Sequence, residues 1–225
     1  MAPGKTPGGQ TTLPTDPPLD CPLCPRLVSL RTELKQQYPD WFNGPVPSFG
    51  DRDPGLLIVG LAPGLKGANR TGRPFTGDYA GDLLYETMLE FGFASGTYEA
   101  RPDDSLTLHQ AMITNAVRCL PPENKPVGAE VKACRPYLLS TLDANPSIVA
   151  ILALGRIAHD TFLTTLGLKK TLYPFSHGGR HDLGVRNLTL FDSYHCSRYN
   201  TNTGRLTPEM FKSVFADIRN MIPRP

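Results

Sequence analysis

The chain has 225 residues, of which 40% are hydrophobic, and this is enough to bury one sizeable core without requiring two domains. Its formal charge is only +2 at pH 7, so the total charge gives no argument for nucleic-acid binding. No apolar run reaches the length of a membrane span, and the first residues lack the apolar core of a signal peptide. We therefore expect an intracellular, cytoplasmic protein without membrane association, in which disulfides are rare and the five cysteines need another explanation.

Residues 1–18 are rich in Gly, Pro and Thr, which predicts a disordered tail ahead of a single domain over residues 19–225. A helix is expected over about residues 27–37, and further along apolar strands alternate with amphipathic helices. The expected strands cover residues 55–60, 111–117, 147–155 and 187–195, and the expected helices begin after Asp78 and cover 129–142, 156–166 and 208–221. Thr207 can cap the last helix, with Pro208 at its first position.

Strands and helices in this alternation are typical of an α/β fold, and the four strands predict a four-stranded, mostly parallel sheet. In such folds ligands bind beyond the carboxyl ends of the strands. This rule selects four segments as candidates for the functional site: residues 60–78, 115–119, 155 onward and 195–207.

The loop GLAPGLKGANRTGRPFTGD, from Gly60 to Asp78, contains many glycines and few bulky side chains. A strand that ends in such a loop brings bare backbone to one place, which indicates the close approach of a ligand. The glycines are not spaced for a dinucleotide or for a Walker lysine motif. Basic residues also gather in the candidate loops, although on charge alone a mixed solvated surface is the simpler explanation.

Four of the cysteines form two pairs. Cys21 and Cys24 have the Cys-x-x-Cys spacing, and fourteen residues separate Cys119 from Cys134. Four thiolates fit either zinc or a 4Fe–4S cluster, and the long second spacing favours the cluster because zinc ribbons usually pair two short knuckles. Scattered buried thiols are the alternative. Cys196 lies outside the pattern, and we expect it to be a spectator thiol rather than a nucleophile.

Four segments in order carry a resemblance to a known family: the Cys-x-x-Cys at Cys21, GLAPG…NRTGRPFTGD, TNAVRCLPPENKPVGAEVKACRPYL and YHCSRYNTNTGRLT. Together they resemble the uracil-DNA glycosylase superfamily in its iron–sulfur branch, and most closely its family 5, or type b. The resemblance extends from Cys21 to the end of the chain. It implies a three-layer α/β/α fold, a 4Fe–4S cluster on Cys21, Cys24, Cys119 and Cys134, and removal of uracil from DNA, with breadth toward hypoxanthine and xanthine.

Two details refine the resemblance. Family 4 enzymes carry a Glu where this chain has Leu61, whereas family 5 resembles this chain in lacking that acid and in having an Asp at Asp78. The histidine-containing basic insert of a relative that bonds covalently to DNA is missing after RCLPPENKP. No lysine is an obvious Schiff-base nucleophile, so we expect a monofunctional enzyme that leaves an abasic site without a strand nick.

The resemblance implies catalytic roles for three residues. Asp78 polarises water or stabilises the cationic sugar, although its position alone fits a helix N-cap. His195 holds the departing base oxygen, and a structural histidine bonded to backbone is the alternative. Asn115 recognises the base and counts among the catalytic residues, and an amide bonded to loop backbone is the alternative.

The base pocket is expected to involve Gly60, Ala62, Phe75 and Asn115. Phe75 gives an aromatic face on which a flipped base can stack, and a core phenylalanine under the loop is the alternative. The residues expected to contact DNA are Arg70, Arg73, Ser197, Arg198, Tyr199, Asn200 and Arg205.

The expected partner is DNA that contains deaminated bases, and we expect a monomer in the cytoplasm, associated with the nucleoid. A catalytically silent iron–sulfur module that binds nucleic acid is the main alternative function. Leu61 in place of the acid favours that alternative, and the presence of Asp78 and His195 opposes it. A zinc-bound hydrolase of small nucleosides is a third possibility.

Overall fold

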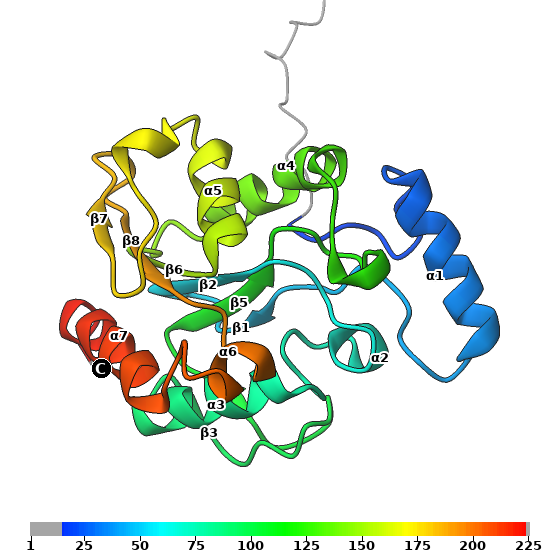
Figure 1. The fold of residues 1–225 in the computed structure, drawn as a ribbon, viewed down its shortest axis with the longest axis horizontal. Coiled ribbons are helices and arrows are strands. Elements are labelled where there is room, and N and C mark those ends of the chain that lie inside the picture. The colour runs from blue at the N-terminus through cyan, green and yellow to red at the C-terminus, as the bar shows by residue number, and fades with distance from the viewer. Residues whose placement is uncertain (1–14, 224–225) are drawn as a thin grey trace, which may run out of the picture.

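A six-stranded sheet forms the centre of the computed structural model, which describes residues 15–223, and helices cover both of its faces (Figure 1). The strands lie in the order β1 (Phe49–Gly50), β5 (Ala111–Asn115), β2 (Leu56–Gly60), β6 (Ala150–Leu154), β8 (Thr189–Ser193) and β7 (Arg180–Asp182). The four middle strands run parallel, and the two edge strands pair antiparallel to their neighbours.

The four parallel strands are the four that the sequence predicts, which confirms the α/β fold with a mostly parallel sheet. The edge strands β1 and β7 were not predicted, because each spans only two or three residues and neither carries an apolar run. A separate two-stranded ribbon, β3 (Ala94–Ser95) with β4 (Thr107–Leu108), was also missed.

The helices are α1 (Pro25–Gln37), α2 (Ala68–Thr71), α3 (Tyr79–Glu90), α4 (Gly128–Ala144), α5 (Arg156–Thr165), α6 (Arg198–Asn202) and α7 (Pro208–Met221), with 3-10 turns η1 (Pro122–Asn124) and η2 (Lys170–Leu172). The five long helices lie within two residues of their expected bounds. The Thr207 hydroxyl accepts a hydrogen bond from the Met210 N–H, which confirms the predicted cap of α7. The short helices α2 and α6 lie in segments that the sequence predicts as loops.

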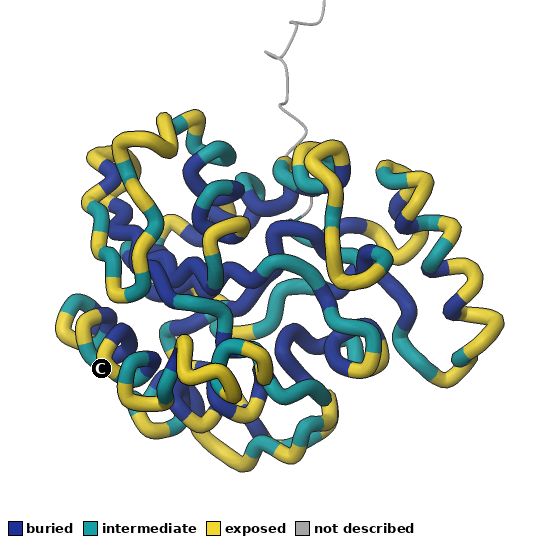
Figure 2. Tube along the Cα trace, in the orientation of Figure 1, coloured by how far each residue is buried: buried dark blue, intermediate teal, exposed yellow. Residues whose placement is uncertain are grey.

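The buried segments of the chain gather at the central strands, and the exposed ones lie mainly on the outer helices and loops (Figure 2). Alternate strand residues belong to two different core clusters. Leu56 and Ile58 pack in one cluster with α3 and α7, whereas Leu57 and Val59 pack in another with α4 and α5. Full burial of one such aliphatic side chain stabilises the fold by about 1.5–3 kcal/mol. The three-layer α/β/α arrangement therefore follows from strands that are apolar on both faces.

Four residues of the expected tail contact the rest of the chain. Asp16 pairs with the guanidinium of Arg118 at 2.8 Å and accepts a hydrogen bond from the Ser48 N–H at 2.9 Å. Arg118 is only 1% exposed, and a buried guanidinium needs such a counter-ion. The end of the expected tail is thus held against the domain through Asp16, and residues 1–14 lie outside the described chain.

Over residues 15–223, no helix has both the length and the apolar character needed to cross a membrane.

Arg73 braces the glycine-rich loop from inside the molecule. Its guanidinium bonds both carboxylate oxygens of Asp104 at 2.7 Å, and its Nε donates to the hydroxyl of Thr76. The rings of Tyr85 and Tyr98 lie beside the same guanidinium. With 4% of its surface exposed, Arg73 does not face solvent, so its expected contact with DNA is replaced by a structural role.

We predict that Asp104→Asn lowers the free energy of unfolding by about 3 kcal/mol, because it leaves the buried guanidinium unpaired. Pairing with Arg73 lowers the pKa of Asp104 to about 2. The stabilisation is therefore present above the ordinary Asp pKa of about 3.9 and is lost as the pH falls toward 2. Urea denaturation checks the prediction, with the exposed neighbour Asp103→Asn as a control that changes stability by less than about 0.5 kcal/mol.

Candidate active site

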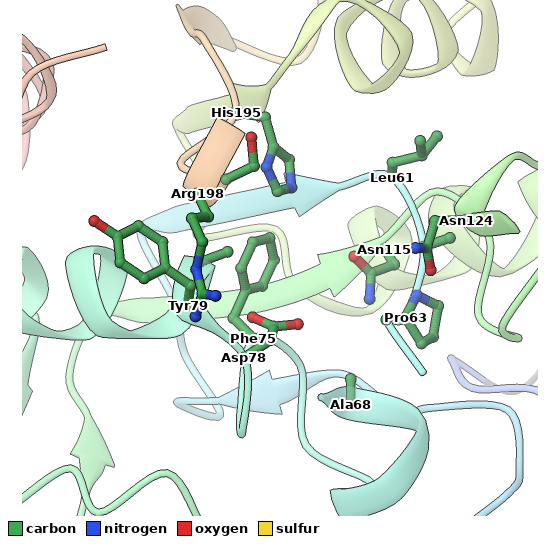
Figure 3. A pocket seen from close by; sticks show the side chains of 14 residues that line it. Leu61, Pro63, Ala68, Phe75, Asp78, Tyr79, Asn115, Asn124, His195 and Arg198 are labelled. Carbon is green, nitrogen blue, oxygen red and sulfur yellow. The ribbon is translucent and has the colours of Figure 1, made fainter. Parts of the chain in front are cut away.

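A cavity of ≈ 410 Å³ opens at the carboxyl ends of the parallel strands (Figure 3). It is lined by Leu61, Ala62, Pro63, Gly64, Ala68, Phe75, Asp78, Tyr79, Ala80, Asn115, Asn124, His195, Ser197 and Arg198. Its volume lies in the range of small-ligand sites. The fold thus brings the segment of Phe75 and Asp78 together with Asn115 and His195, which stand far from it and from each other in the sequence.

Gly60 allows a ring and an amide to meet at the end of β2. A Cβ at this position would overlap the Asn115 Oδ1 and would lie 2.8 Å from the Phe75 ring. Phe75 has φ +52°, an uncommon backbone conformation for a bulky residue, and its side chain forms a wall of the cavity. Asn115 is 3% exposed and turns its carboxamide toward the cavity (Figure 3).

Asp78 occupies the N-cap position of α3, yet within the described chain its side chain makes no capping hydrogen bond. Its Oδ1 atom is buried without a hydrogen-bond partner among residues 15–223. Burial raises the pKa of Asp78, and the nearby N–H groups of Gly81 and Ala80 oppose this shift in part. The carboxylate is therefore held at the cavity beside the first N–H groups of α3, with its Oδ1 left without a partner within the described residues.

Two glycines make room for this carboxylate. A Cβ on Gly67 would overlap the Asp78 Oδ2, and a Cβ on Gly64 would lie 3.1 Å from the same oxygen. Real Cβ contacts are seldom this short, so any larger residue at Gly67 must displace the carboxylate. The glycines of this loop therefore serve the position of Asp78 as well as the approach of a ligand.

His195 follows β8 and stacks on Phe75, with ring centroids 5.8 Å apart. Burial lowers the pKa of His195 to about 4. The imidazole is therefore neutral near pH 7 and carries a single N–H to donate.

The residues after His195 form the rim of the cavity. Tyr199 is 72% exposed, and the Arg198 guanidinium lies 5.2 Å from the centre of the Tyr79 ring. Ser197 caps α6 by accepting a hydrogen bond from the Asn200 N–H, and the Asn200 side chain donates to the His195 carbonyl at 2.8 Å. Ser197 and Asn200 thus shape the loop.

A second cavity of ≈ 330 Å³ shares His195 with the first and includes Arg156, Tyr194 and Arg205. The Arg205 guanidinium lies 4.5 Å from the centre of the Tyr194 ring. Arg70 is exposed on α2. Three arginines, at positions 156, 198 and 205, therefore line the two cavities, and Arg70 lies on the segment between β2 and α3.

Sequence reasoning missed Tyr79, Asn124 and Arg156. Asn124 lies on the rim with φ +57°, directly after Glu123 with φ +53°. Two successive left-handed residues in the PPEN turn aim this side chain, and no sequence pattern predicts such a conformation. Arg156 begins α5 directly after Gly155, where the expected strand and helix bounds meet.

Cys21, Cys24, Cys119 and Cys134 line one small cavity together. The Arg118 N–H donates to the Cys134 sulfur at 3.3 Å. Burial, followed by the proximity of the other thiols, raises the pKa of Cys119 to about 12, and burial raises that of Cys134 to about 11. These thiols stay protonated unless a cation binds them, and soft thiolate donors suit zinc or an iron–sulfur cluster.

The spacing of the sulfur atoms bears on which metal they suit. Within residues 15–223, no three of the cysteine sulfurs all lie within 4.8 Å of one another. The one group of three potential metal ligands that meets this distance in the described chain is His159, His181 and Asp192. A single zinc ion would hold four sulfurs about 3.8 Å apart at Zn–S distances of about 2.3 Å. The sulfurs are therefore spread more widely than a zinc site requires. Cys196 is separate and fully buried, and its thiol donates to the Ala80 carbonyl.

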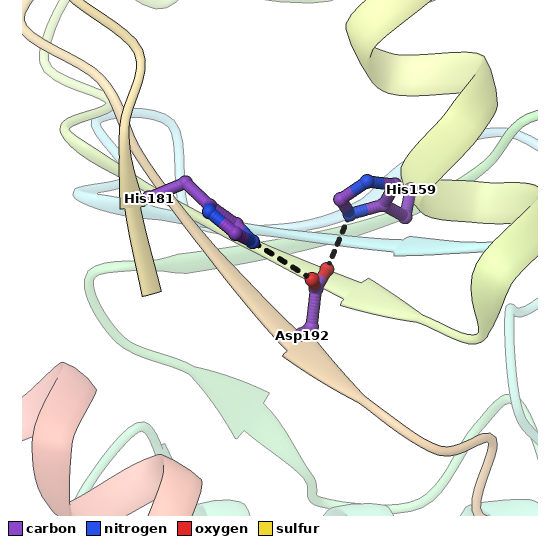
Figure 4. Close-up of side chains that lie close together, drawn as sticks. All are labelled: His159, His181 and Asp192. Atoms are coloured by element: carbon purple, nitrogen blue, oxygen red, sulfur yellow. Dashed lines mark hydrogen bonds and ion pairs between the residues drawn. The ribbon is translucent and has the colours of Figure 1, made fainter. Parts of the chain in front are cut away.

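The group of His159, His181 and Asp192 is an ion-pair network (Figure 4). The two ring nitrogens of His159 lie 2.7 Å from an Asp192 oxygen and 2.8 Å from the Tyr173 carbonyl. Burial lowers the pKa of His159, but Asp192 and this carbonyl outweigh it, so the net shift is upward. Both ring nitrogens are engaged by these contacts, to Asp192 and to the Tyr173 carbonyl, so the group is held together by its own hydrogen bonds. The network ties α5 to β8, three residues before His195.

Comparison with known proteins agrees with this geometry. Residues 47–219 match the model of the Uracil DNA glycosylase superfamily. The chain is 46% identical over 208 residues to a type-5 uracil-DNA glycosylase of Thermus thermophilus, covering 89% of this chain and 93% of the relative. It is 40% identical over 209 residues to a type-5 uracil-DNA glycosylase of Mycobacterium tuberculosis, and the match covers 89% of this chain and 78% of the relative. A type-4 uracil-DNA glycosylase of Pyrobaculum aerophilum is 36% identical over 124 residues, and that match covers 54% of this chain and 55% of the relative.

The chain therefore belongs to the uracil-DNA glycosylase superfamily. Within that superfamily it belongs to the type-5 enzymes. The resemblance drawn from the sequence motifs is confirmed.

We predict that Gly67→Ala lowers the free energy of unfolding by about 1–3 kcal/mol, because the new methyl group and the Asp78 carboxylate cannot occupy the same space. Gly128→Ala is the matched control, since a Cβ there meets nothing within 4 Å. Denaturant titration of both variants checks the prediction. Equal stability of the two variants would show that Gly67 does not confine the carboxylate.

Proposed function

We propose that the protein is a monofunctional glycosylase that hydrolyses the N-glycosidic bond of uracil in DNA and leaves an abasic site. The observation that carries this proposal is the Asp78 carboxylate, whose buried Oδ1 has no partner within the described residues and which faces a cavity shared with Phe75, Asn115 and His195. The type-5 relatives, which are named as uracil-DNA glycosylases, support the choice of substrate.

The cavity suits a base that has been swung out of the duplex. The Phe75 ring offers a face for stacking, and the Asn115 amide can both donate to and accept from the edge of uracil. Stacking and two-sided hydrogen bonding hold the base in one orientation. Gly60 permits both side chains to approach the same point.

Bond cleavage builds negative charge on the departing base and positive charge on the sugar. Neutral His195 can donate its N–H to the base oxygen, which would stabilise the base anion. Asp78 can stabilise the cationic sugar or orient water, and its partial exclusion from solvent strengthens either effect.

The rim of the cavity supplies the contacts to the DNA strand. Arg198 and Arg205 line the two cavities and can pair with phosphates, which positions the duplex without reading its sequence. Arg70 lies exposed on α2, outside both cavities, and can add a further phosphate contact. Exposed Tyr199 can enter the gap that the flipped nucleotide leaves. Arg156 joins this set through the second cavity.

A 4Fe–4S cluster held by Cys21, Cys24, Cys119 and Cys134 is part of the proposal. The shared cavity of the four thiols and their wide spacing support a cluster over a single zinc ion. Bound there, the cluster would cross-link the start of α1 to the segment that joins β5 to α4. Its role is structural, since the cysteines do not line the Asp78 cavity.

The proposal also covers the range of bases that the enzyme removes and the place in the cell where it acts. Leu61, Ala62 and Pro63 give the cavity apolar walls where family 4 enzymes carry an acid, and such walls admit bases other than uracil, including hypoxanthine and xanthine. We further expect a monomer that acts in the cytoplasm, at the nucleoid.

Single-turnover incubation with duplexes that carry one uracil, hypoxanthine or xanthine tests this function. We predict strand breakage only after alkali treatment, with uracil as a substrate, and the relative rates report the breadth. Breakage without alkali would contradict the monofunctional mechanism. Absence of breakage on every duplex, with intact DNA binding, would favour a catalytically silent binding module, which Leu61 makes the main competitor.

We predict that Asp78→Asn slows uracil release by about 10²–10³-fold, the usual effect of removing one electrostatic contact to a transition state.

We also predict that the wild-type rate of uracil release falls as the pH falls through the raised pKa of Asp78, because the protonated acid loses its charge. No step is expected near pH 6.5, because the pKa of His195 is about 4. Exposed Asp53, at the opposite end of β2, gives the control Asp53→Asn, which leaves the pH profile unchanged.

A further inference from the structure

Two arginines lie buried beside the four cysteines. Arg31 on α1 is 8% exposed, and Arg118 after β5 is 1% exposed. The charge of Arg118 is balanced by Asp16, whose carboxylate lies 2.8 Å from its Nη1. Its side chain also donates to the Val46 carbonyl and to the Thr141 hydroxyl. Arg118 is thus satisfied by the protein alone.

Arg31 is surrounded differently. Its Nη2 donates to the Cys21 carbonyl at 3.0 Å, and its Nη1 lies 3.8 Å from the Cys119 sulfur. Among residues 15–223, no carboxylate lies within 4.0 Å of its guanidinium. A buried guanidinium without a counter-ion is strongly unfavourable, so a negative charge has to come from elsewhere.

The sulfur atoms beside Arg31 can supply this charge only as thiolates. A metal-bound cysteine is a thiolate, and four of them around an iron–sulfur group leave a net negative charge in a buried space. Cys21 and Cys119 come from the two different halves of the four-cysteine set. The Arg31 fork touches both residues and thus bridges the N-terminal segment and the segment after β5.

We propose that Arg31 is the counter-ion of the anionic iron–sulfur group and retains it by donating N–H to the Cys119 sulfur. This inference rests on the proposed cluster and adds a positioning residue that none of the cysteine motifs contains. Groups of this kind around metal ligands commonly change metal retention by about 10–100-fold. Arg118, with its carboxylate partner, has a role in folding instead.

Three variants of the full chain test the proposal. Arg31→Met keeps much of the side-chain length and removes the charge, Arg31→Lys keeps the charge and removes the fork, and Lys35→Gln removes an exposed charge one turn further along α1. Iron and acid-labile sulfide per chain are measured on each purified protein. The rate at which a chelator removes the iron is then followed by visible absorbance, and circular dichroism reports the fold.

We expect Arg31→Met to lose iron about 10-fold faster than the wild type or more, Arg31→Lys to fall between them, and Lys35→Gln to match the wild type. Equal rates for Arg31→Met and Lys35→Gln would overturn the proposal. Equal losses in Arg31→Met and Arg31→Lys would also overturn it, because they would show that shape and not charge matters. A wild-type protein without iron and sulfide would instead contradict the proposed cluster itself. If Arg31→Met does not fold, the iron-loss rates of Arg31→Lys and Lys35→Gln are compared instead. An Arg31→Lys protein that loses iron no faster than Lys35→Gln would overturn the proposal, because the guanidinium would then not be needed to retain the cluster.

Discussion

The position of the Asp78 carboxylate is the constraint around which the site is built. A carboxylate at a helix N-cap ordinarily accepts a hydrogen bond from the first turn, and this one does not within the described chain. Gly64 and Gly67 leave space for one oxygen, and the other is buried without a partner among residues 15–223. This arrangement sacrifices local stability, which is typical of a group reserved for a ligand or a transition state.

Two charge networks hold the loops around this carboxylate. Arg73 and Asp104 brace the loop between β2 and α3 from inside the core. His159 and Asp192 tie α5 to the strand that ends before His195. Buried pairs of this kind add little net stability, but removal of one partner is costly. Their effect is to fix geometry, so that rings, amide and carboxylate meet within one cavity.

The sequence predicts the apolar core of this fold well and its polar supports poorly. Continuous apolar runs, such as residues 56–59, leave little choice but a buried parallel strand, and the Thr207 cap fixes the start of α7. The site residues after these strands could be named because the carboxyl ends of parallel strands meet at one edge. The partner of Arg73, by contrast, is 31 residues away, and a local pattern cannot distinguish a buried arginine from one that faces DNA. The direction of the Asn124 side chain depends on two successive residues in the left-handed conformation, which local propensity does not predict.

The measurement that tests the account most directly is the crystal structure of Asp78→Asn bound to a duplex that carries one uracil. The account predicts that the uracil has left the duplex and lies against the Phe75 ring, with its edge on Asn115 and its oxygen near His195. Uracil that stays stacked in the duplex, or a base in the cavity beside Arg156, would contradict the assignment of the site.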